Sequence, residues 1–311
     1  MDAVAKRDHR HRVAGVAALV LAAAALLTRW TVRDSVWPVS AFFYATPCWV
    51  VLGATAAAWR LLKQSPRLRE AAGVAAAMTA CWCVGKDVRP FAEAAGGRAD
   101  FRVVHWNGMG IHDDPERAAA VLRSLDADVI CLVEAGGRSP GRQAFWAEQL
   151  PEHEGVFFGH SFVILTKHPA EMISEPFVRP EGAHVEAALT IAGRRVHFVL
   201  VHPLSNPVYD RTRVMRLLAA RAAELRGTPT VLTGDFNLPS DSAHFDAVRK
   251  DYALASDAAG PMLRPTWPSV LPLLTLDQVW VGGGLEAAGC RHVWDWYSDH
   301  RPVVTDLRIA N

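Results

Sequence analysis

Thr233-Gly234-Asp235-Phe236-Asn237 ends an apolar run that begins at Thr230. A short apolar run bounded by turn-forming residues is typical of a strand that is buried on both faces of a sheet. Side chains two positions apart on an extended segment point to the same side, so Asp235 and Asn237 are expected to lie next to each other. The stretch therefore predicts a strand of a packed sheet that holds a carboxylate and an amide at its end.

Three further stretches place a carboxylate beside an apolar run. They are Leu132-Val133-Glu134, Leu276-Asp277-Gln278 and Ser298-Asp299-His300-Arg301-Pro302-Val303. Oxygen ligands of this kind suit Mg²⁺ or Mn²⁺, and the absence of paired cysteines or a His-x-x-x-His pattern argues against a zinc site. Together the four stretches predict a divalent-metal site that acts on a phosphoester.

Two more stretches complete a pattern that resembles a known family. They are His105-Trp106-Asn107 and Phe198-Val199-Leu200-Val201-His202-Pro203. In their order along the chain, the six stretches resemble the pattern of the endonuclease/exonuclease/phosphatase superfamily of DNase I-like enzymes. The resemblance covers residues 101–307. It implies a four-layer α/β sandwich, in which two mixed sheets pack face to face with helices outside.

The pattern of apolar residues in the same region alternates strands with helices. Helices are expected at residues 114–125, where Asp114 is the cap, at 139–150 and at 207–226. Strands are expected at 101–106, 129–133, 162–166, 230–233 and 278–281, and a hairpin at 185–201 that turns through Ala192-Gly193-Arg194. The roughly 220 residues from Phe91 onward can bury one sizeable core, so one catalytic domain is expected after a linker, at residues 101–311.

The resemblance also implies which residues hold the cation. Glu134 corresponds to the principal metal ligand of the family, and Asn107 lies close by as a direct or water-mediated partner. Asp299 is assigned to the metal side of the site. An ordinary strand-end Glu that pairs with an Arg is the alternative for Glu134, but the flanking motifs favour the ligand. The expected cofactor is Mg²⁺ or Mn²⁺.

The remaining matched residues are expected to act on the phosphoester. Asp235 would orient or deprotonate the attacking water, while Asn237 would hold phosphate or water. His300 would contact the scissile phosphate, and Asp277 would accept a hydrogen bond from its imidazole and raise its pKa. His202 would contact the phosphate or donate a proton to the leaving group.

The amino-terminal part of the chain has a different composition. Residues 1–90 hold 12 Lys and Arg against 5 Asp and Glu, whereas residues 91–311 hold 21 against 27. Uncharged segments cover residues 13–28, 35–59 and 71–85. Because a spanning helix needs about 20 apolar residues, the second segment qualifies outright, the first qualifies if it extends toward Trp30, and the third is short. Residues 1–90 are therefore expected to be a membrane anchor with two or three transmembrane helices, joined through a linker at 91–100.

Loop charges predict how this anchor is oriented. Lys6, Arg7, Arg10 and Arg12 precede the first segment, and Arg60, Lys63, Arg67 and Arg69 lie between the second and the third. Basic loops stay in the cytoplasm, so three spans place the catalytic domain on the extracytoplasmic side of a multi-pass protein and two spans place it in the cytoplasm. Three spans are the expectation. A cleavable signal peptide at residues 1–28 is the alternative for the first segment.

The sequence leaves the substrate open among three hypotheses. The favoured one is a membrane-anchored phosphodiesterase or phosphatase that acts on a small or lipid-linked phosphoester. A membrane-anchored endonuclease or exonuclease with the same residues is the second, although a formal net charge of −6 for residues 91–311 disfavours tight non-specific binding of DNA. The third is a non-catalytic scaffold that retains the fold, and the acidic and imidazole residues speak against it. The expected partners are the phosphoester and the bilayer, and no protein partner is identifiable.

Overall fold

The computed structural model describes residues 3–88, 98–109, 114–159, 161–175, 177–178, 182–260 and 263–310. These residues belong to two compact units, Met1–Arg89 and Pro90–Asn311. The linker expected at residues 91–100 lies largely outside the described residues, because only 98–100 of it is described. We call the first unit the helical unit and the second the catalytic unit.

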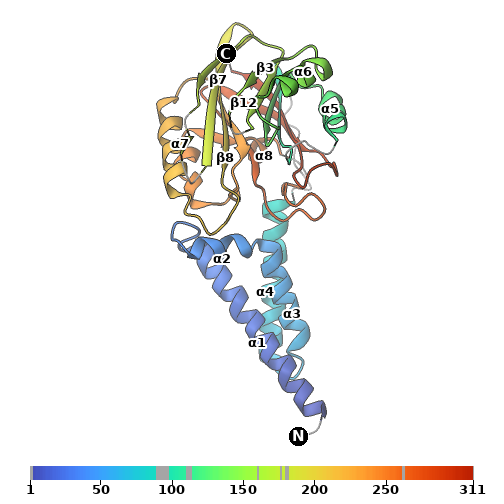
Figure 1. The fold of residues 1–311 in the computed structure, drawn as a ribbon. Coiled ribbons are helices and arrows are strands. Elements are labelled where there is room, and N and C mark those ends of the chain that lie inside the picture. Colours follow the sequence, from blue (N-terminus) through green and yellow to red (C-terminus); the bar gives the residue numbers. More distant parts are fainter. Residues whose placement is uncertain are drawn as a thin grey trace. The chain divides into compact units, whose positions relative to one another are not determined.

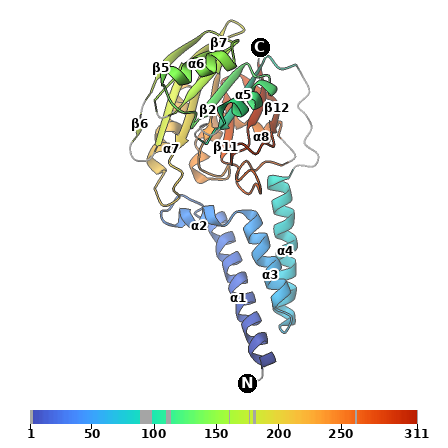
Figure 2. The same ribbon diagram turned by 45° about the vertical axis from the view of Figure 1, so that its right-hand side comes forward.

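The described part of the helical unit, residues 3–88, forms four helices. They are α1 (Ala3–Trp30), α2 (Val39–Ala45), α3 (Cys48–Leu61) and α4 (Pro66–Asp87). Helix α3 packs against both α1 and α4, and the three run alongside one another (Figure 2). The contacts are made by small or medium apolar side chains, such as Ala25 against Val51 and Ala72 against Leu62, which allow the helices to approach closely.

Helix α1 contains a stretch that is long and apolar enough to cross a membrane, Ala5–Trp30. The second apolar segment, residues 35–59, is not the single spanning helix that the sequence predicts. It forms α2 and α3, which are bent by 74° at a break. Pro47 is the cap residue of α3 and has no amide hydrogen, so a continuous helix would lose a hydrogen bond there. Helix α4 contains the third segment.

The catalytic unit contains two mixed sheets. The first has the order β12-β13-β1-β2-β4-β3, and the second has the order β10-β11-β9-β8-β7-β5, with the short β6 paired to β7. The strands of the first sheet are β1 (Phe101–Asn107), β2 (Val129–Val133), β3 (Glu154–Phe157), β4 (Val163–Thr166), β12 (Leu285–His292) and β13 (Val303–Ile309). Those of the second are β5 (Ala170–Ser174), β6 (Phe177–Val178), β7 (Gly182–Ile191), β8 (Arg194–Pro203), β9 (Thr230–Asp235), β10 (Tyr252–Leu254) and β11 (Asp277–Gly282).

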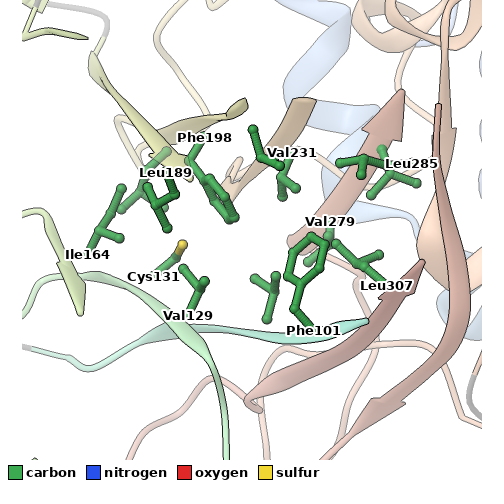
Figure 3. Packing of buried hydrophobic residues seen from close by; sticks show 14 of the residues in the cluster. Phe101, Val129, Cys131, Ile164, Leu189, Phe198, Val231, Val279, Leu285 and Leu307 are labelled. Atoms are coloured by element: carbon green, nitrogen blue, oxygen red, sulfur yellow. The ribbon is translucent and has the colours of Figure 1, made fainter. Parts of the chain in front are cut away.

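The main core lies between the two sheets. Val129 and Cys131 of β2 belong to the same buried cluster as Phe198 of β8 and Val231 of β9 (Figure 3). Successive side chains of a strand point to opposite faces, so the alternate residues of β2, such as Ile130, belong to a different cluster on the outer face. Burial of both faces explains why these strands are continuously apolar in sequence.

Helices cover the outer faces and complete four layers (Figure 1). Helices α5 (Pro115–Ser124) and α6 (Pro140–Gln149) bury Leu122 and Trp146 against the first sheet. Asp114 and Ser139 cap them by accepting hydrogen bonds from backbone amides, an interaction worth about 1 kcal/mol. Helix α7 (Thr212–Glu224) lies on the second sheet, to which Arg221 is tied by hydrogen bonds to Glu186 of β7.

This architecture confirms the fold that the family resemblance implies, with small differences at the ends of elements. Helix α7 begins five residues later than residue 207, because residues 204–211 form a loop. The hairpin between β7 and β8 turns through Ala192 and Gly193, both with positive φ, so Arg194 belongs to β8 rather than to the turn. The short helices α8 (Ala255–Ala258), η1 (Ala243–Phe245) and η2 (Val248–Lys250) surround the end of the second sheet near β10.

The register of the strands brings the polar stretches to one edge. In the parallel pair β1–β2, Asn107 is opposite Val133, so Glu134 follows beside it. In the parallel pair β8–β9, Val201 is opposite Gly234, so His202 and Asp235 are neighbours. In the antiparallel pair β9–β11, Asp235 is directly opposite Asp277. The carboxyl ends of four strands and the beginning of β11 therefore meet.

Candidate active site

Asp235 lies at the centre of the polar groups that gather at this edge. Its side chain is buried, with 1% of the residue exposed, and its Oδ1 accepts a hydrogen bond from the backbone amide of Asn237 at 2.9 Å. Its Oδ2 accepts hydrogen bonds from Asn107 Nδ2 at 3.0 Å and Asn237 Nδ2 at 3.3 Å. His202 Nε2 and His300 Nε2 each lie 3.8 Å from the same oxygen. Four other predicted site residues, Asn107, His202, Asn237 and His300, thus converge on this one carboxylate.

Glu134 and His202 form the more open side of the site. Glu134 Oε1 accepts a hydrogen bond from Asn107 Nδ2 at 3.2 Å and lies 3.3 Å from His202 Nε2. The Glu134 side chain is 41% exposed, so solvent and ligands reach it. The hydrogen bond from His202 holds the pKa of Glu134 below its ordinary value. Burial opposes protonation of His202, but Glu134 and Asp235 outweigh it and raise the pKa of His202.

A second group of three residues lies deeper and consists of Asp277 between two histidines. His300 Nδ1 donates to Asp277 Oδ2 at 2.8 Å, and His105 Nε2 lies 3.3 Å from Asp277 Oδ1. Burial favours the neutral form of Asp277, but the two histidines outweigh it and lower its pKa. Burial likewise opposes protonation of His300, yet the carboxylates, Asp277 first, raise its pKa to about 10. His300 is therefore an imidazolium at neutral pH, with Nε2 turned toward Asp235.

The loop that carries His300 is fixed by hydrogen bonds to the end of β1. The His300 carbonyl accepts from Trp106 Nε1 at 3.0 Å. Ser298 Oγ donates to the Asn107 carbonyl at 2.8 Å and accepts from the His300 amide at 3.0 Å. This loop joins β12 to β13, so the first sheet supplies His300 while the second supplies Asp235. The candidate site therefore lies between the ends of the two sheets.

Asp299 lies toward the outside of the same loop. Its Oδ2 accepts a hydrogen bond from Trp267 Nε1 at 2.8 Å, and its Oδ1 is 3.9 Å from His300 Nε2. The contacts described for its side chain join it to Trp267 and His300 and not to Glu134. Adjacent residues Asp299 and His300 both face the site region because the chain is irregular between β12 and β13.

Backbone strain is concentrated at the ends of these strands. Glu134, Asn237 and Met109 have φ values of +53°, +50° and +47°, in the left-handed region that side chains other than glycine seldom adopt. Each such residue costs on the order of 1 kcal/mol, and such costs persist where the surrounding structure imposes them. The reversal after β2 is what directs the Glu134 carboxylate back toward Asn107.

The donor groups present fit a hard divalent cation in one of two places. Asp235, Asp277 and His300 offer candidate ligand atoms that all lie within 4.8 Å of one another. Both Asp277 oxygens already face histidines, however, so few of its lone pairs are available. Glu134 and Asn107 offer a partly open carboxylate and an amide at the mouth, and we favour them as the holders of a cation. The Asn107 amide would have to rotate, because its nitrogen, not its oxygen, faces Glu134 in this structure.

A comparison with protein families identifies the chain. A profile of the Endonuclease/Exonuclease/phosphatase family matches residues 104–300, which include every residue of the candidate site. The chain belongs to this family. The family relationship that the six sequence stretches indicate is thereby confirmed, and members of the family are hydrolases that act on phosphoesters. A comparison with curated protein sequences gave no match.

Solved structures of endonuclease/exonuclease/phosphatase proteins share the fold. A mannosyl-6-phosphatase from Bacteroides thetaiotaomicron is 15% identical and has a TM-score of 0.55, with 67% of this chain and 99% of that chain covered. TDP2 from D. rerio in complex with a single-strand DNA product is 14% identical and has a TM-score of 0.52, with coverage of 67% and 98%. TDP2 from Caenorhabditis elegans is 14% identical and has a TM-score of 0.54, with coverage of 66% and 96%. At these identities the likeness establishes the fold alone.

The predicted site residues are brought together, with Asp299 at the periphery, and three further residues contribute that were not predicted as site residues. His105 lies inside an apolar strand, where a histidine more often satisfies the core than serves a site. Thr266 Oγ1 accepts from the amides of Leu276 and Asp277, each at 3.1 Å, and so positions the start of β11. Trp267 donates to Asp299. Thr266 and Trp267 could not be predicted, since both act from a loop with no recognisable motif.

Proposed function

We propose that the protein is a membrane-anchored phosphoester hydrolase that depends on Mg²⁺ or Mn²⁺. The observation that carries this proposal is the convergence on Asp235 of Asn107, Asn237, His202 and His300, from both sheets and within 3.8 Å. A buried carboxylate between two imidazoles is an arrangement that suits proton transfer to and from a water molecule and a leaving group. Family membership supports the same class of reaction.

Each residue of the candidate site has its own role in the proposed hydrolysis. Glu134 and Asn107 would hold the cation, with Asp299 on the outer side, and the bound cation would supply positive charge to the phosphate oxygens. Asp235 orients the attacking water and takes its proton, while Asn237 fixes the Asp235 carboxylate through two hydrogen bonds. His300, held as a cation by Asp277, stabilises charge on the phosphate. His202 donates a proton to the departing oxygen.

Membrane anchoring rests on helix α1. Its stretch Ala5–Trp30 has the length and apolar composition of a transmembrane segment, and Lys6, Arg7, Arg10 and Arg12 at its start favour a cytoplasmic amino terminus. Helix α4 has 22 residues, a length of about 33 Å at 1.5 Å per residue, and charged residues at both ends. The bent pair α2–α3 passes the same length and hydropathy test when it is taken as one broken span. We propose that this pair is the second span and α4 the third, so that the catalytic unit is extracytoplasmic.

A substrate panel tests the proposed activity. Full-length protein in detergent is assayed with bis-p-nitrophenyl phosphate, p-nitrophenyl phosphate, plasmid DNA and phospholipid, each with Mg²⁺, with Mn²⁺ and with EDTA. We expect turnover of at least one phosphoester that EDTA abolishes and added Mg²⁺ or Mn²⁺ restores. Turnover of none of these substrates would favour a scaffold without catalytic activity.

Asp235→Asn provides the variant for this assay. We expect it to lower kcat by about 10²-fold or more, because general-base catalysis commonly contributes 10²–10⁴. Asp251→Asn is the matched control, because Asp251 pairs with Arg226 next to β10 and touches none of the site residues described above. A near-normal rate for Asp235→Asn, together with normal folding, would remove Asp235 from the proposed role.

Nuclease activity is the second candidate. Trp294 and Trp296 are exposed, and their ring centroids lie 6.3 Å apart on the loop that leads to His300. Pairs of exposed aromatic rings can stack on the bases of single-stranded nucleic acid. The negative charge of residues 91–311 argues against it, and cleavage of DNA in the panel above without turnover of the other substrates would establish it.

A further inference from the structure

The exposed apolar side chains of the catalytic unit are concentrated around the candidate site. Among the described residues of this unit, ten large hydrophobic side chains are exposed, and eight of them belong to loops attached to site residues. The two others are Met172 on β5 and Leu217 on α7. Single exposed hydrophobic residues are normal on a protein surface, but a group of them around one site indicates an interaction surface.

Two of the loops follow β1 and β8. Met109 is 53% exposed, and its amide donates to Asn107 Oδ1 at 3.0 Å. The loop after β8 is held by the hydrogen bond from Asn237 Nδ2 to the Pro203 carbonyl at 3.0 Å and by Arg211, whose Nη2 donates to the Leu204 carbonyl at 2.8 Å. The exposed residues that this loop carries are Leu204, Val208 and Tyr209.

The other two loops meet at Asp299. The Ser269 amide donates to the Asp299 carbonyl at 2.7 Å, and the next two residues, Val270 and Leu271, are 67% and 65% exposed. Trp294 lies under the Arg301 guanidinium at 4.2 Å, and Trp296 is 65% exposed. The eight exposed residues of the four loops are together called the rim: Met109, Leu204, Val208, Tyr209, Val270, Leu271, Trp294 and Trp296.

The rim has few charges that could bind an anionic partner. Residues 265–276 contain no Asp, Glu, Lys or Arg, and Asp295 accompanies the two tryptophans. The loop after β8 carries Asp210 and Arg211, and Arg211 is buried. Nucleic acid binding depends on cationic side chains that neutralise phosphates, and the rim does not provide them. Tryptophan, tyrosine and aliphatic residues together are instead typical of a protein surface that enters the boundary between lipid headgroups and acyl chains.

We propose that the rim inserts into the bilayer surface and that the site takes phosphoesters of amphiphiles that reside in that bilayer. The bilayer is the partner that the chain itself indicates for the rim, because the apolar stretch of α1 would keep the catalytic unit at a membrane. A tethered enzyme meets lipid substrates at a high effective concentration, and shallow insertion of four loops would align the site with headgroup phosphates. This inference rests on the proposed hydrolase function and on the proposed anchoring.

A fluorescent label tests insertion without any need for activity. The cysteines Cys48, Cys83, Cys131 and Cys290 are buried, so Cys81→Ser removes the one exposed cysteine among the described residues. In this background, Leu271→Cys is labelled with an environment-sensitive fluorophore, and the full chain is reconstituted into neutral phosphatidylcholine vesicles. Met172→Cys, also an exposed apolar position, is the matched control.

The proposal predicts that the label at residue 271 is quenched by lipids that carry a quencher just below the headgroup, and that high salt does not release it. The label at residue 172 should remain accessible to an aqueous quencher. Equal aqueous quenching at both positions, in protein that stays with the vesicles after carbonate extraction, would overturn rim insertion. Loss of the whole protein on carbonate extraction would instead contradict the anchoring on which the inference rests.

The substrate part is tested by a ratio of activities in the same vesicles. Hydrolysis of a bilayer phospholipid is divided by hydrolysis of bis-p-nitrophenyl phosphate, for the unaltered chain, Trp296→Ser and Met172→Ser. We expect this ratio to fall about tenfold for Trp296→Ser, since loss of about 1.4 kcal/mol of membrane interaction is tenfold in affinity, and to stay constant for Met172→Ser.

An unchanged ratio for Trp296→Ser would contradict a lipid-facing site. Hydrolysis of bis-p-nitrophenyl phosphate without hydrolysis of phospholipid would overturn the amphiphile assignment while the proposed hydrolase function stands. Absence of both activities would count against the hydrolase itself, whereas the fluorescence result would still decide insertion. Activity on single-stranded DNA that Trp296→Ser alone abolishes would assign the rim to nucleic acid.

Discussion

At the scale of single residues, the buried carboxylate of Asp277 determines the charge of the site. It lies between His105 and His300, and the three side chains are almost completely inaccessible to solvent. A buried carboxylate with two imidazole neighbours remains ionised, and its charge in turn favours protonation of the histidine that accompanies it. His300 consequently keeps its proton well above neutral pH, with a pKa of about 10. Nε2 of the charged His300 ring lies 3.8 Å from Asp235 Oδ2, so the positive charge faces Asp235.

The first prediction concerns the pH dependence that Asp277 produces. Turnover that needs protonated His300 should be retained below the raised pKa and lost as the pH rises through about 10. Asp277→Asn removes the largest influence that raises this pKa, while burial, which lowers it, remains. The alkaline limb of kcat should therefore move down by roughly one to three pH units, the effect of one close opposite charge.

The measurement is kcat for bis-p-nitrophenyl phosphate from neutral to strongly alkaline pH. Asp306→Asn is the control, because Asp306 of β13 pairs with Arg102 of β1, and its loss should leave the limb in place. A limb that does not move in Asp277→Asn would show that His300 does not act as a cation.

The site could be predicted from the sequence at residues that belong to a local motif. Asp235 and Asn237 are recognisable because they follow an apolar strand, and His300 is recognisable because it ends the tripeptide Ser298-Asp299-His300. His105 was not assigned, because its partner Asp277 is 172 positions away and only the pairing of sheets brings them together. The contact of Asp299 with Trp267 could not be predicted for the same reason, since the two residues are also far apart in the sequence.

At the scale of elements, the close approach of β8 and β9 holds the two halves of the site together. Gly234 lies opposite Val201, and a Cβ at this position would come within 1.9 Å of the Val201 carbonyl oxygen. Only glycine therefore permits the pairing that places His202 beside Asp235. The glycine in the stretch that begins at Thr233 is a packing requirement of the sheet and not a feature of the chemistry.

The second prediction follows from this contact. Gly234→Ala should destabilise the catalytic unit by about 1–3 kcal/mol, the usual cost of overpacking, which corresponds to a fall in Tm of roughly 2–10 °C for a unit of this size. It should also lower activity, because His202 and Asp235 are displaced. Thermal unfolding followed by near-ultraviolet circular dichroism measures the first effect.

Gly289→Ala is the control for Gly234→Ala. Gly289 is also a strand glycine, but its nearest neighbour would be Asp306 Oδ2 at 3.4 Å, an ordinary contact. We expect its Tm to change by no more than about 2 °C. Equal stability of the two variants would show that the pairing of β8 with β9 tolerates a side chain at residue 234.

Each element predicted in the catalytic unit has the expected type, whereas several boundaries differ, and the strands β3, β5, β6, β10, β12 and β13 were not predicted. The starts of α5 and α6 are predictable, because the cap residues Asp114 and Ser139 each precede a proline at the first helical position. Helix α7 starts later than expected because Asn206 and Asp210 form turns with the amides of Val208 and Thr212, and apolar spacing does not reveal such turns. The break between α2 and α3 is likewise a local event at Pro47 inside a uniformly apolar segment.

At the scale of the whole molecule, the chain combines an apolar helical unit with a hydrolase fold. The abrupt change in charge and hydrophobicity near residue 90 was visible in sequence because the two units face different requirements. Which side of a membrane the catalytic unit occupies depends on whether the bent pair α2–α3 and helix α4 each span, and the composition of α4 is intermediate. The number of spans is therefore the feature that the sequence determines least.

The third prediction concerns this topology. If α4 is the last span, a protease added to intact cells that express the chain should digest the catalytic unit while a cytoplasmic marker stays intact. Deletion of residues 66–88, which comprise α4 and its cap Val88, should reverse the result, because one span fewer would leave the catalytic unit in the cytoplasm. Protection of the unaltered catalytic unit, with digestion only after the cells are opened, would contradict an extracytoplasmic location.

The central claim is that strand ends from both sheets build one centre that binds a divalent cation at Glu134 and hydrolyses a phosphoester. A titration of turnover against Mg²⁺ for the unaltered chain and Glu134→Gln tests it most directly, with Glu171→Gln, an exposed residue of β5, as the control. The account predicts that Glu134→Gln needs at least about tenfold more Mg²⁺ for half-maximal turnover of bis-p-nitrophenyl phosphate, a loss on the order of 1.4 kcal/mol of binding free energy. A titration curve identical to that of the unaltered chain would contradict it.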